Sequence, residues 1–232
     1  MKNNSESSIH TLTSIAGIAD VIIHPPIEHL QSFWQGGKFF ESVMLEHIWQ
    51  RYSGGVFIDV GSAIGNHTLF FAKFCSPSQV ISIEPMPFQI EHQREILALN
   101  SVADKVRILN VALSDKRGRC DMEHFAGSLG QYRVKDKIVG TEGDTIVTTL
   151  DDVVSDMHLS DITLIKIDVE HHEMPVLKGA VNTLTNYSPA LFIEIVGQPM
   201  HPIETFLSQF GYTRISDRFP RANAFEFVKG DK

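Results

Sequence analysis

Residues 56–66, VFIDVGSAIGN, contain the pattern that decides the fold. The apolar run Val56–Val60 predicts a buried strand, and the pattern from about Gly65 to Phe74 predicts a helix. Gly61 lies in the turn between them, where glycine allows the backbone to turn sharply and to approach a ligand closely. A buried strand, a glycine-containing turn and a helix together predict the first unit of a parallel α/β sheet.

The same alternation continues toward the C-terminus. Because parallel neighbours need long, right-handed crossovers, strands separated by helices favour a doubly wound sheet. The last two runs fit a closing pair of strands. The predicted strands are Val80–Ile83, Val106–Val111, Thr163–Asp168, Ala190–Ile195, Tyr212–Ser216 and Phe225–Lys229, with helices at 89–100, 150–157, 175–185 and 203–210.

Two segments fall outside this alternation. Residues 27–52 have a helical pattern divided by Gly36 and Gly37, which predicts two helices forming a lid. Residues 114–149 are rich in glycine and poor in long apolar runs, which predicts an inserted hairpin or substrate loop. We therefore expect an N-terminal arm and helical lid over 1–52 and one domain over 53–232, with an insertion at about 118–146. Residues 9–24 receive no assignment.

Composition limits the class of protein. The 232 residues carry a formal net charge of -8, which disfavours non-specific binding to nucleic acid. Cys75 and Cys120 are too few for a disulfide scaffold and suit a reducing cytosol. No apolar run reaches the roughly 18 to 20 residues that span a bilayer, and the N-terminus is a poor signal peptide. We expect a soluble, cytoplasmic protein with no nucleic-acid or membrane partner.

The glycine loop indicates a class of ligand. The spacing Gly-x-x-x-Gly at Gly61 and Gly65 differs from the Gly-x-Gly-x-x-Gly of pyrophosphate cradles. A nucleoside ligand without phosphates, such as S-adenosylmethionine, fits it better, and Asp59 would then face the ligand's ammonium group. The alternative is a tight strand–helix turn that binds nothing.

Glu84 closes the second strand, 23 residues after Gly61. An acid at this position can accept two hydrogen bonds from a ribose diol. Pro85 breaks the strand where the carboxylate must project. The alternative is a solvated acid at a strand end.

Charged residues also end two later strands. Lys166 and Asp168 share a face of one strand because residues two apart point the same way. Glu194 ends the next strand, and a charge within such an apolar run is costly unless it is paired, so we expect a Lys166–Glu194 ion pair. A purely structural pair is the alternative. Asp168, Glu194 and a histidine also resemble a set of metal ligands, although a divalent metal is not expected.

Two histidines are candidates for a general base, since the unperturbed pKa of histidine is about 6.5. They are His67, after the glycine loop, and His172, after the strand that ends at Asp168. Phe40 and Glu41 follow Gly37 and are predicted to close over the cofactor, with simple helix packing as the alternative for Phe40.

The whole pattern resembles the FkbM family of S-adenosylmethionine-dependent methyltransferases, from about Gly37 to Glu194. The resemblance rests on several segments in the family's order and spacing. They are FIDVGSAIGNHTLFFAK, VISIEPMPFQIEHQREILALN, VRILNVALSDKRG, TTLDDVV, DITLIKIDVEHHEMPVLKGA and PALFIEI. The resemblance implies a seven-stranded, doubly wound, Rossmann-like sheet with helices on both faces and an antiparallel last strand.

The resemblance also implies a cofactor site. Its members follow the first, second and third strands and begin the helix after the glycine loop: Asp59, Gly61, Ser62, Ala63, Gly65, Asn66, Thr68, Glu84, Pro85, Ala112, Ser114 and, after a later strand, Asp168. Glu170 matches a second acid of that later strand. Two positions depart from the family pattern, which has asparagine where this chain has Ala63 and glycine where it has His171. If that glycine needs a positive φ, His171 brings strain, a different loop path or a new functional group.

The implied reaction is transfer of the methyl group of S-adenosylmethionine to a hydroxyl oxygen of a sugar, glycan or small natural product, leaving S-adenosylhomocysteine. Asp168 and His172 are predicted to orient or deprotonate the acceptor, with Glu194 and Lys166 stabilising them. Residues 120–145 and the N-terminal helices are predicted to shape the acceptor pocket. The remaining candidates for substrate contact are Glu41, His67, Glu170 and His171.

Two alternatives stay open. One is a nicotinamide-dependent oxidoreductase, against which the glycine spacing argues. The other is a non-catalytic module that keeps the fold, which the departures at Ala63 and His171 raise. The oligomeric state is open, with a homodimer as one option.

Overall fold

The computed structural model describes residues 7–24, 29–124, 131–135 and 139–230. Residues 1–6 and the Pro25-Pro26 pair lie outside the described residues. Within the described part of the chain, no helix combines the length and hydropathy that crossing a membrane requires.

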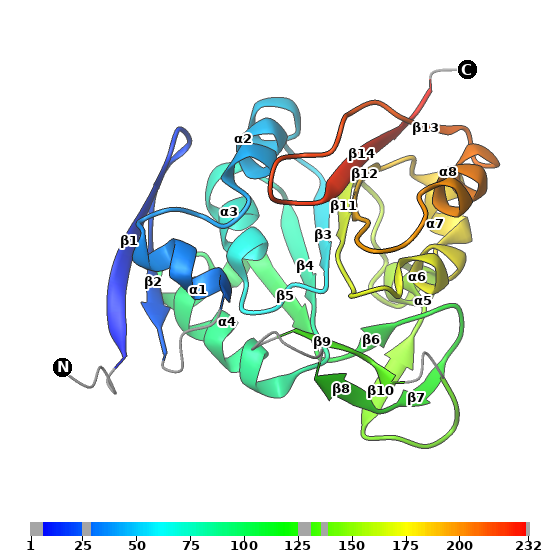
Figure 1. The fold of residues 1–232 in the computed structure, drawn as a ribbon, viewed down its shortest axis with the longest axis horizontal. Helices are drawn as coiled ribbons and strands as arrows, with labels where there is room; N and C mark the ends of the chain where they lie inside the picture. Colours follow the sequence, from blue (N-terminus) through cyan, green and yellow to red (C-terminus); the bar gives the residue numbers. More distant parts are fainter. Residues whose placement is uncertain (1–6, 25–28, 125–130, 136–138, 231–232) are drawn as a thin grey trace.

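A seven-stranded sheet forms the centre of the molecule (Figure 1), in the order β13-β14-β12-β11-β3-β4-β5. β14 is antiparallel to both of its neighbours, whereas β12, β11, β3, β4 and β5 run parallel. The predicted doubly wound sheet with an antiparallel last strand is confirmed. The strands are β3 (Val56–Val60), β4 (Gln79–Ile83), β5 (Val106–Leu109), β11 (Ile162–Ile167), β12 (Ala190–Glu194), β13 (Tyr212–Arg214) and β14 (Ala224–Lys229).

Helices cover both faces of this sheet (Figure 1) because the inner strands bury side chains in both directions. Phe57 packs into one core cluster and Ile58 into the other, and Phe192 and Ile193 divide in the same way. One core takes residues from α1 (His29–Gln35), α2 (Ser42–Arg51), α3 (Asn66–Phe74) and α4 (Pro87–Leu99). The other takes residues from α5 (Leu150–Asp156), α6 (Glu173–Lys178), α7 (Val181–Asn186) and α8 (His201–Ser208).

The helix predicted over 175–185 is two short helices, α6 and α7, with Pro175 in the first turn of α6 as expected. The helix is interrupted at Gly179 and Ala180, which separate α6 from α7. A Cβ at Gly179 would lie 2.1 Å from the carbonyl oxygen of Ser114, so the backbone passes close to the strand region there. This close contact comes from tertiary packing and has no signal in the helical periodicity.

The N-terminal segment begins with a hairpin that the sequence left unassigned, β1 (Ser8–Ser14) and β2 (Gly17–Ile23). Leu12 and Val21 bury their side chains in the core. The amide side chain of Asn100, at the end of α4, bonds both the backbone N–H and the carbonyl of Asp20. The hairpin is thereby attached to the helix layer, and the two predicted helices, α1 and α2, follow it.

The predicted insertion forms two small sheets near the carboxyl ends of β4 and β5. One is the hairpin β8 (Met122–His124) and β9 (Tyr132–Val134). The other is a three-stranded sheet in the order β6-β10-β7, from β6 (Ala112–Leu113), β7 (Gly118–Cys120) and β10 (Thr145–Thr148). The strand predicted over Val106–Val111 therefore ends at Leu109, and a short 3₁₀ turn, Ala103–Lys105, precedes it. Residues 125–130 and 136–138 of the insertion lie outside the described part.

Candidate active site

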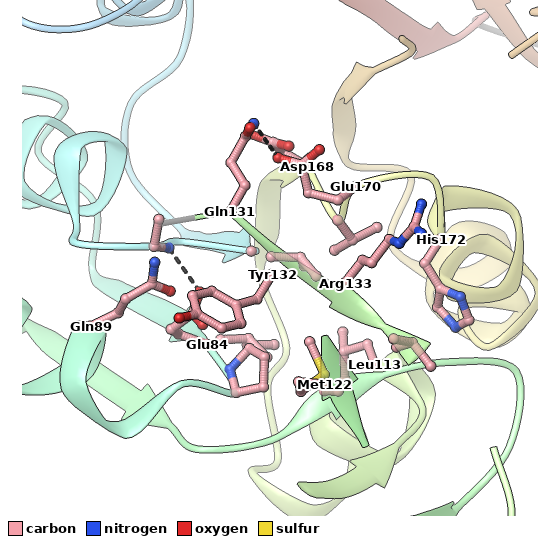
Figure 2. Close-up of a pocket in the computed structure, with 18 of the residues that line it drawn as sticks. Glu84, Gln89, Leu113, Met122, Gln131, Tyr132, Arg133, Asp168, Glu170 and His172 are labelled. Carbon is pink, nitrogen blue, oxygen red and sulfur yellow. Dashed lines mark hydrogen bonds between the residues drawn. The ribbon is translucent and has the colours of Figure 1, made fainter. Parts of the chain in front are cut away.

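A cavity opens where β3, β4, β5 and β11 end, the edge at which open parallel sheets bind ligands. It holds about 1010 Å³ of space not filled by atoms, part of it open to solvent. Figure 2 shows Glu84 and Gln89 on one side and His172 on the opposite side, with Tyr132 between them. The β8–β9 hairpin covers the cavity through Met122, Tyr132, Arg133 and Val134.

The glycines of the first loop are required by the protein's own packing. Gly61 has a φ of 73°, and a Cβ there would lie 1.7 Å from the carbonyl oxygen of Asp168. Gly65 has a φ of 91°, and its Cβ would lie 2.7 Å from Gln93. Gly61 also lines the cavity. The absence of a side chain therefore lets the segments after β3 and β11 pack closely and exposes the loop backbone to the cavity.

Ala63 has a φ of 48°, in the left-handed region that alanine seldom adopts and asparagine tolerates. Its backbone N–H donates to Oε2 of Glu84 over 2.9 Å. The Gln93 side chain donates to the carbonyl of Ala63 over 2.6 Å and to the Ser62 hydroxyl over 2.8 Å. A buried polar network therefore holds this loop, and Ser82 completes it by donating to Ser62.

Glu84 projects from the end of β4 into the cavity and is 4% exposed. Its Oε1 accepts a hydrogen bond from the N–H of Met86 over 2.9 Å. Burial raises the pKa of Glu84 to about 7, although the hydrogen bonds from the backbone N–H groups of Met86 and Ala63 act to lower it. Glu84 is thus a buried carboxylate at this edge of the sheet, held by the backbone N–H groups of Ala63 and Met86.

Lys166 lies between two carboxylates. Its Nζ is 3.3 Å from Oδ2 of Asp168 and 3.5 Å from Oδ1 of Asp59. The ion pair predicted with Glu194 is wrong in its partner, because Lys166 instead pairs with Asp59 and Asp168. Burial by itself would lower the pKa of Lys166, but Asp168 and Asp59 outweigh it and raise the pKa. Asp59 is fully buried and accepts a 2.6 Å hydrogen bond from Thr68, so it lies behind the loop and is not one of the cavity residues.

Glu194 is hydrogen-bonded to Asp168. Burial, followed by the adjacent Asp168 carboxylate, raises the pKa of Glu194 far above its usual range, so the proton shared by the two carboxyl groups lies on Glu194, which donates the hydrogen bond. Burial also disfavours the charge on Asp168, but Lys166 and the bond from Glu194 together lower its pKa. Asp168 is thus an ionised carboxylate at the cavity wall, supported on two sides.

The turn after β11 has an unusual backbone. Glu170 has a φ of 51° and His171 a φ of 72°, two successive left-handed residues that are not glycine. The positive φ at His171 falls where the resemblance expects glycine, so a non-glycine residue carries backbone strain there. Glu170 lines the cavity and accepts a hydrogen bond from the Gln131 side chain. Burial, followed by repulsion from Asp168, raises the pKa of Glu170 to about 7.

His172 closes the opposite side of the cavity. It is 3% exposed, and its Nε2 lies 2.9 Å from the Ser114 hydroxyl. The two residues, predicted for different roles, are therefore in direct contact. Ser114 itself does not line the cavity.

The N-terminal segment contributes a second buried pair, Glu41 and His67, with Oε2 and Nε2 2.8 Å apart. Burial raises the pKa of Glu41, and the hydrogen bond from His67 opposes that rise. Neither residue lines the cavity, although Leu30 and Phe40 of the same segment do. Asn66 explains how this segment is attached, because its side chain bonds Trp34 Nε1 and both backbone groups of Phe40.

The cavity brings eight predicted site residues together and leaves the others outside its wall. Those that line it are Gly61, Ala63, Glu84, Pro85, Ala112, Asp168, Glu170 and His172. Those that do not are Glu41, Asp59, Ser62, Gly65, Asn66, His67, Thr68, Ser114, Lys166, His171 and Glu194. The second set is mostly the hydrogen-bonded shell described above. Within the described residues, no three His, Cys, Asp or Glu side chains gather as a metal site would require.

The sequence predicted that the insertion would shape the pocket but did not identify its cavity-lining residues. Among these are Met122, Gln131, Tyr132 and Arg133. Tyr132 packs edge-on against Phe88 of α4, with ring centroids 5.6 Å apart, and Arg133 Nε donates to Glu123 over 2.7 Å. Their only signal was the interrupted α/β alternation, which located the segment but not the side chains that face inward.

Comparisons with known proteins agree with this geometry. A family model described as the methyltransferase FkbM domain matches residues 59–214. The 2-O-methyltransferase NoeI of Sinorhizobium fredii is 27% identical over 196 residues, 76% of this chain and 77% of that protein. The hexuronic acid methyltransferase AglP of Haloferax volcanii is 32% identical over 130 residues, 54% of this chain but only 50% of that protein.

Solved structures support the fold. The crystal structure of methyltransferase FkbM from Methylobacillus flagellatus superposes with a TM-score of 0.54 at 17% identity, covering 77% of this chain and 44% of that one. A putative rRNA methylase from Clostridium thermocellum gives a TM-score of 0.51 at 10% identity, covering 83% of this chain and 98% of that one. Both likenesses concern the arrangement of strands and helices alone.

Proposed function

The chain belongs to the FkbM family of methyltransferases, and from that premise we propose that it moves the methyl group of S-adenosylmethionine to a hydroxyl oxygen of a sugar. The sugar acceptor is supported by two relatives, a 2-O-methyltransferase and a hexuronic acid methyltransferase. The observation that carries the proposal is Glu84, a buried carboxylate that ends β4 inside the cavity beside the glycine loop.

The residues present fit such a cofactor. Glu84 would accept hydrogen bonds from the ribose diol, and the backbone of Gly61 and Ala63 would border the amino-acid portion. The apolar wall at Val111, Ala112 and Leu113 would line the adenine. When bound, the cofactor supplies a methyl group already activated by a sulfonium.

The protein's own contribution to the reaction is alignment and charge. Asp168 is held ionised by Lys166 and Glu194, and a fixed carboxylate at the cavity wall stabilises a nearby cation without reorganising. His172, held by its contact with Ser114 behind the wall, borders the far end, where the acceptor would lie. Holding the acceptor oxygen in line with the methyl carbon and sulfur accounts for most of the catalysis required.

Titration calorimetry tests the cofactor first. We expect saturable heat with S-adenosylmethionine and none with NAD; heat with NAD alone would support the oxidoreductase alternative. Transfer of a labelled methyl group to a panel of mono- and oligosaccharides then tests the reaction. Binding of the cofactor without turnover on any hydroxylated acceptor would favour a non-catalytic module.

A further inference from the structure

We propose that Glu170 is the catalytic base that removes the proton from the acceptor hydroxyl, and that Gln131 positions its carboxylate. This rests on the proposed function and deepens it by assigning the proton-transfer step to a residue that the sequence suggested only as a substrate contact. Glu170 and Gln131 both line the cavity, Glu170 from the turn after β11 and Gln131 from the position immediately before β9.

The carboxylate of Asp168 and the Nε2 of His172 are already engaged by other side chains of the protein. Asp168 is bound by the Lys166 ammonium at 3.3 Å and by the hydroxyl of the protonated Glu194. Both interactions stabilise its charge, so it is a weak base. His172 directs its Nε2 at the Ser114 hydroxyl, 2.9 Å away, and is nearly fully buried.

Glu170 differs in having one oxygen held and one available. Oε1 accepts the hydrogen bond from Gln131. Within the described part of the chain, Oε2 has no hydrogen-bonding partner. A general base needs a fixed orientation together with an oxygen within reach of the acceptor hydroxyl, and this arrangement supplies both.

The backbone of the turn after β11 is strained where it directs the Glu170 side chain toward the cavity, which is consistent with a functional role. Glu170 and His171 are consecutive non-glycine residues at positive φ, a backbone conformation that L side chains adopt only with strain. Glycine would relieve the strain at His171 but the chain has none there. Strain of this kind persists where the surrounding structure needs a particular side-chain direction.

Charged groups around Glu170 adjust its basicity to neutral pH. Burial raises its pKa to about 7, helped by the like charges of Asp168 and Glu173. The hydrogen bond from Gln131 and the charge of Lys166 oppose the rise. A base is most effective when its pKa is near the working pH, since it is then both ionised and basic enough.

The step balances without a further reactant. The acceptor oxygen forms a bond to the methyl carbon as the carbon–sulfur bond breaks, and the electron pair of that bond stays on sulfur. The acceptor proton passes to Oε2 of Glu170, which becomes a neutral carboxylic acid and then releases the proton to solvent. A sulfonium cation and a carboxylate are consumed, and a neutral thioether and a carboxylic acid are formed.

Glu170→Gln tests the assignment, with Glu91→Gln, at an exposed position on α4, as the matched control. We expect Glu170→Gln to lower kcat by about 100- to 10,000-fold, while the Kd for S-adenosylmethionine changes little. With S-adenosylmethionine saturating at every pH, so that Glu84 does not contribute, the wild-type pH profile of kcat/KM for the acceptor should rise with pH through about 7, and this inflection should vanish from the residual activity of the variant. ¹³C NMR of labelled glutamate should likewise lose a carboxyl resonance that titrates near neutrality.

Gln131→Leu tests the positioning role. Removing the hydrogen bond that lowers the pKa of Glu170 should move the inflection to higher pH and reduce kcat more than it changes KM. An active wild type whose Glu170→Gln variant keeps its rate and its pH profile would overturn the assignment alone. A wild type that transfers no methyl group to any sugar would overturn the proposed function and the assignment together.

Discussion

The backbone N–H of Ala63 donates to Oε2 of Glu84 over 2.9 Å, so the loop after β3 fixes the carboxylate that ends β4. The two residues are 21 positions apart and follow the ends of two adjacent parallel strands, β3 and β4. The contact holds one carboxylate oxygen in place before any ligand arrives. It also joins two segments that the sequence indicated separately as cofactor-binding.

Cofactor affinity should depend on the ionisation of Glu84. Since burial raises the pKa of Glu84 to about 7, protonation below that pH removes the acceptor that a ribose diol needs. We expect the Kd for S-adenosylmethionine to be constant above pH 8 and to rise by up to tenfold per pH unit well below 7. Calorimetry across pH 5.5–8.5 measures this.

Glu84→Gln provides the matching variant. It should weaken binding by about 10- to 100-fold at pH 8, since a hydrogen bond to a charged group is worth about 1.5–3 kcal/mol, and it should flatten the pH dependence. Glu142→Gln, at an exposed residue of the insertion, should leave both unchanged. An affinity of Glu84→Gln equal to that of wild type would show that this carboxylate does not hold the ribose.

Lys166→Met should destabilise the fold strongly. It leaves Asp59 and Asp168 without their cation, and breaking a buried ion pair by removing one partner costs about 3–5 kcal/mol. Urea unfolding at pH 7 checks this, with Lys178→Met in the last turn of α6 as a control. A loss below about 1 kcal/mol, the size of a surface pair, would mean that the cluster is more solvated than the structure indicates.

Unlike Lys166→Met, Glu194→Gln should not destabilise the fold at pH 7, because Glu194 is already neutral at that pH. A raised folded-state pKa makes a group's contribution to stability complete below its unfolded pKa and smaller as pH rises above that value. For Glu194 this window opens at 4.5 and extends upward through neutral pH, because burial and the adjacent Asp168 raise the folded-state pKa. The glutamine variant should therefore gain stability over wild type as pH rises, by up to about 1.4 kcal/mol per pH unit, in urea unfolding at pH 5, 7 and 9. An equal pH dependence of the two proteins would contradict a protonated Glu194.

His171→Gly should stabilise the protein slightly. Relief of the left-handed strain at a φ of 72° gains about 1–2 kcal/mol, and the greater entropy loss of glycine on folding removes about 0.5–1 kcal/mol of that gain. We expect a net increase in the free energy of unfolding of up to about 1.5 kcal/mol, measured as a rise in Tm. A fall in Tm would mean that the imidazole contacts outweigh the strain, and His171→Asn, which tolerates this backbone region, separates the two effects.

Much of the sheet followed from local pattern. The run Val56–Val60 and the glycine turn after it gave the first strand and helix, because burial on both faces leaves a continuous apolar run that is visible in the sequence. The hairpin at β1 and β2 gave no such signal. Each strand has only seven residues; β1 buries Leu12 alone, whereas β2 alternates buried and half-buried residues. The attachment of the hairpin depends on Asn100, far along the chain.

The site, like the fold, was only partly predictable from the sequence. The sequence alone determined which residues end the strands, and so which carboxylates, among them Glu84, Asp168 and Glu170, meet at one edge of the sheet, since parallel strands all end there. Only the tertiary structure decided their partners and charge states. Lys166 pairs with Asp168 instead of Glu194, and Gln131 reaches Glu170 from a separate hairpin, because distance, burial and hydrogen bonding depend on packing between segments that sequence spacing does not specify.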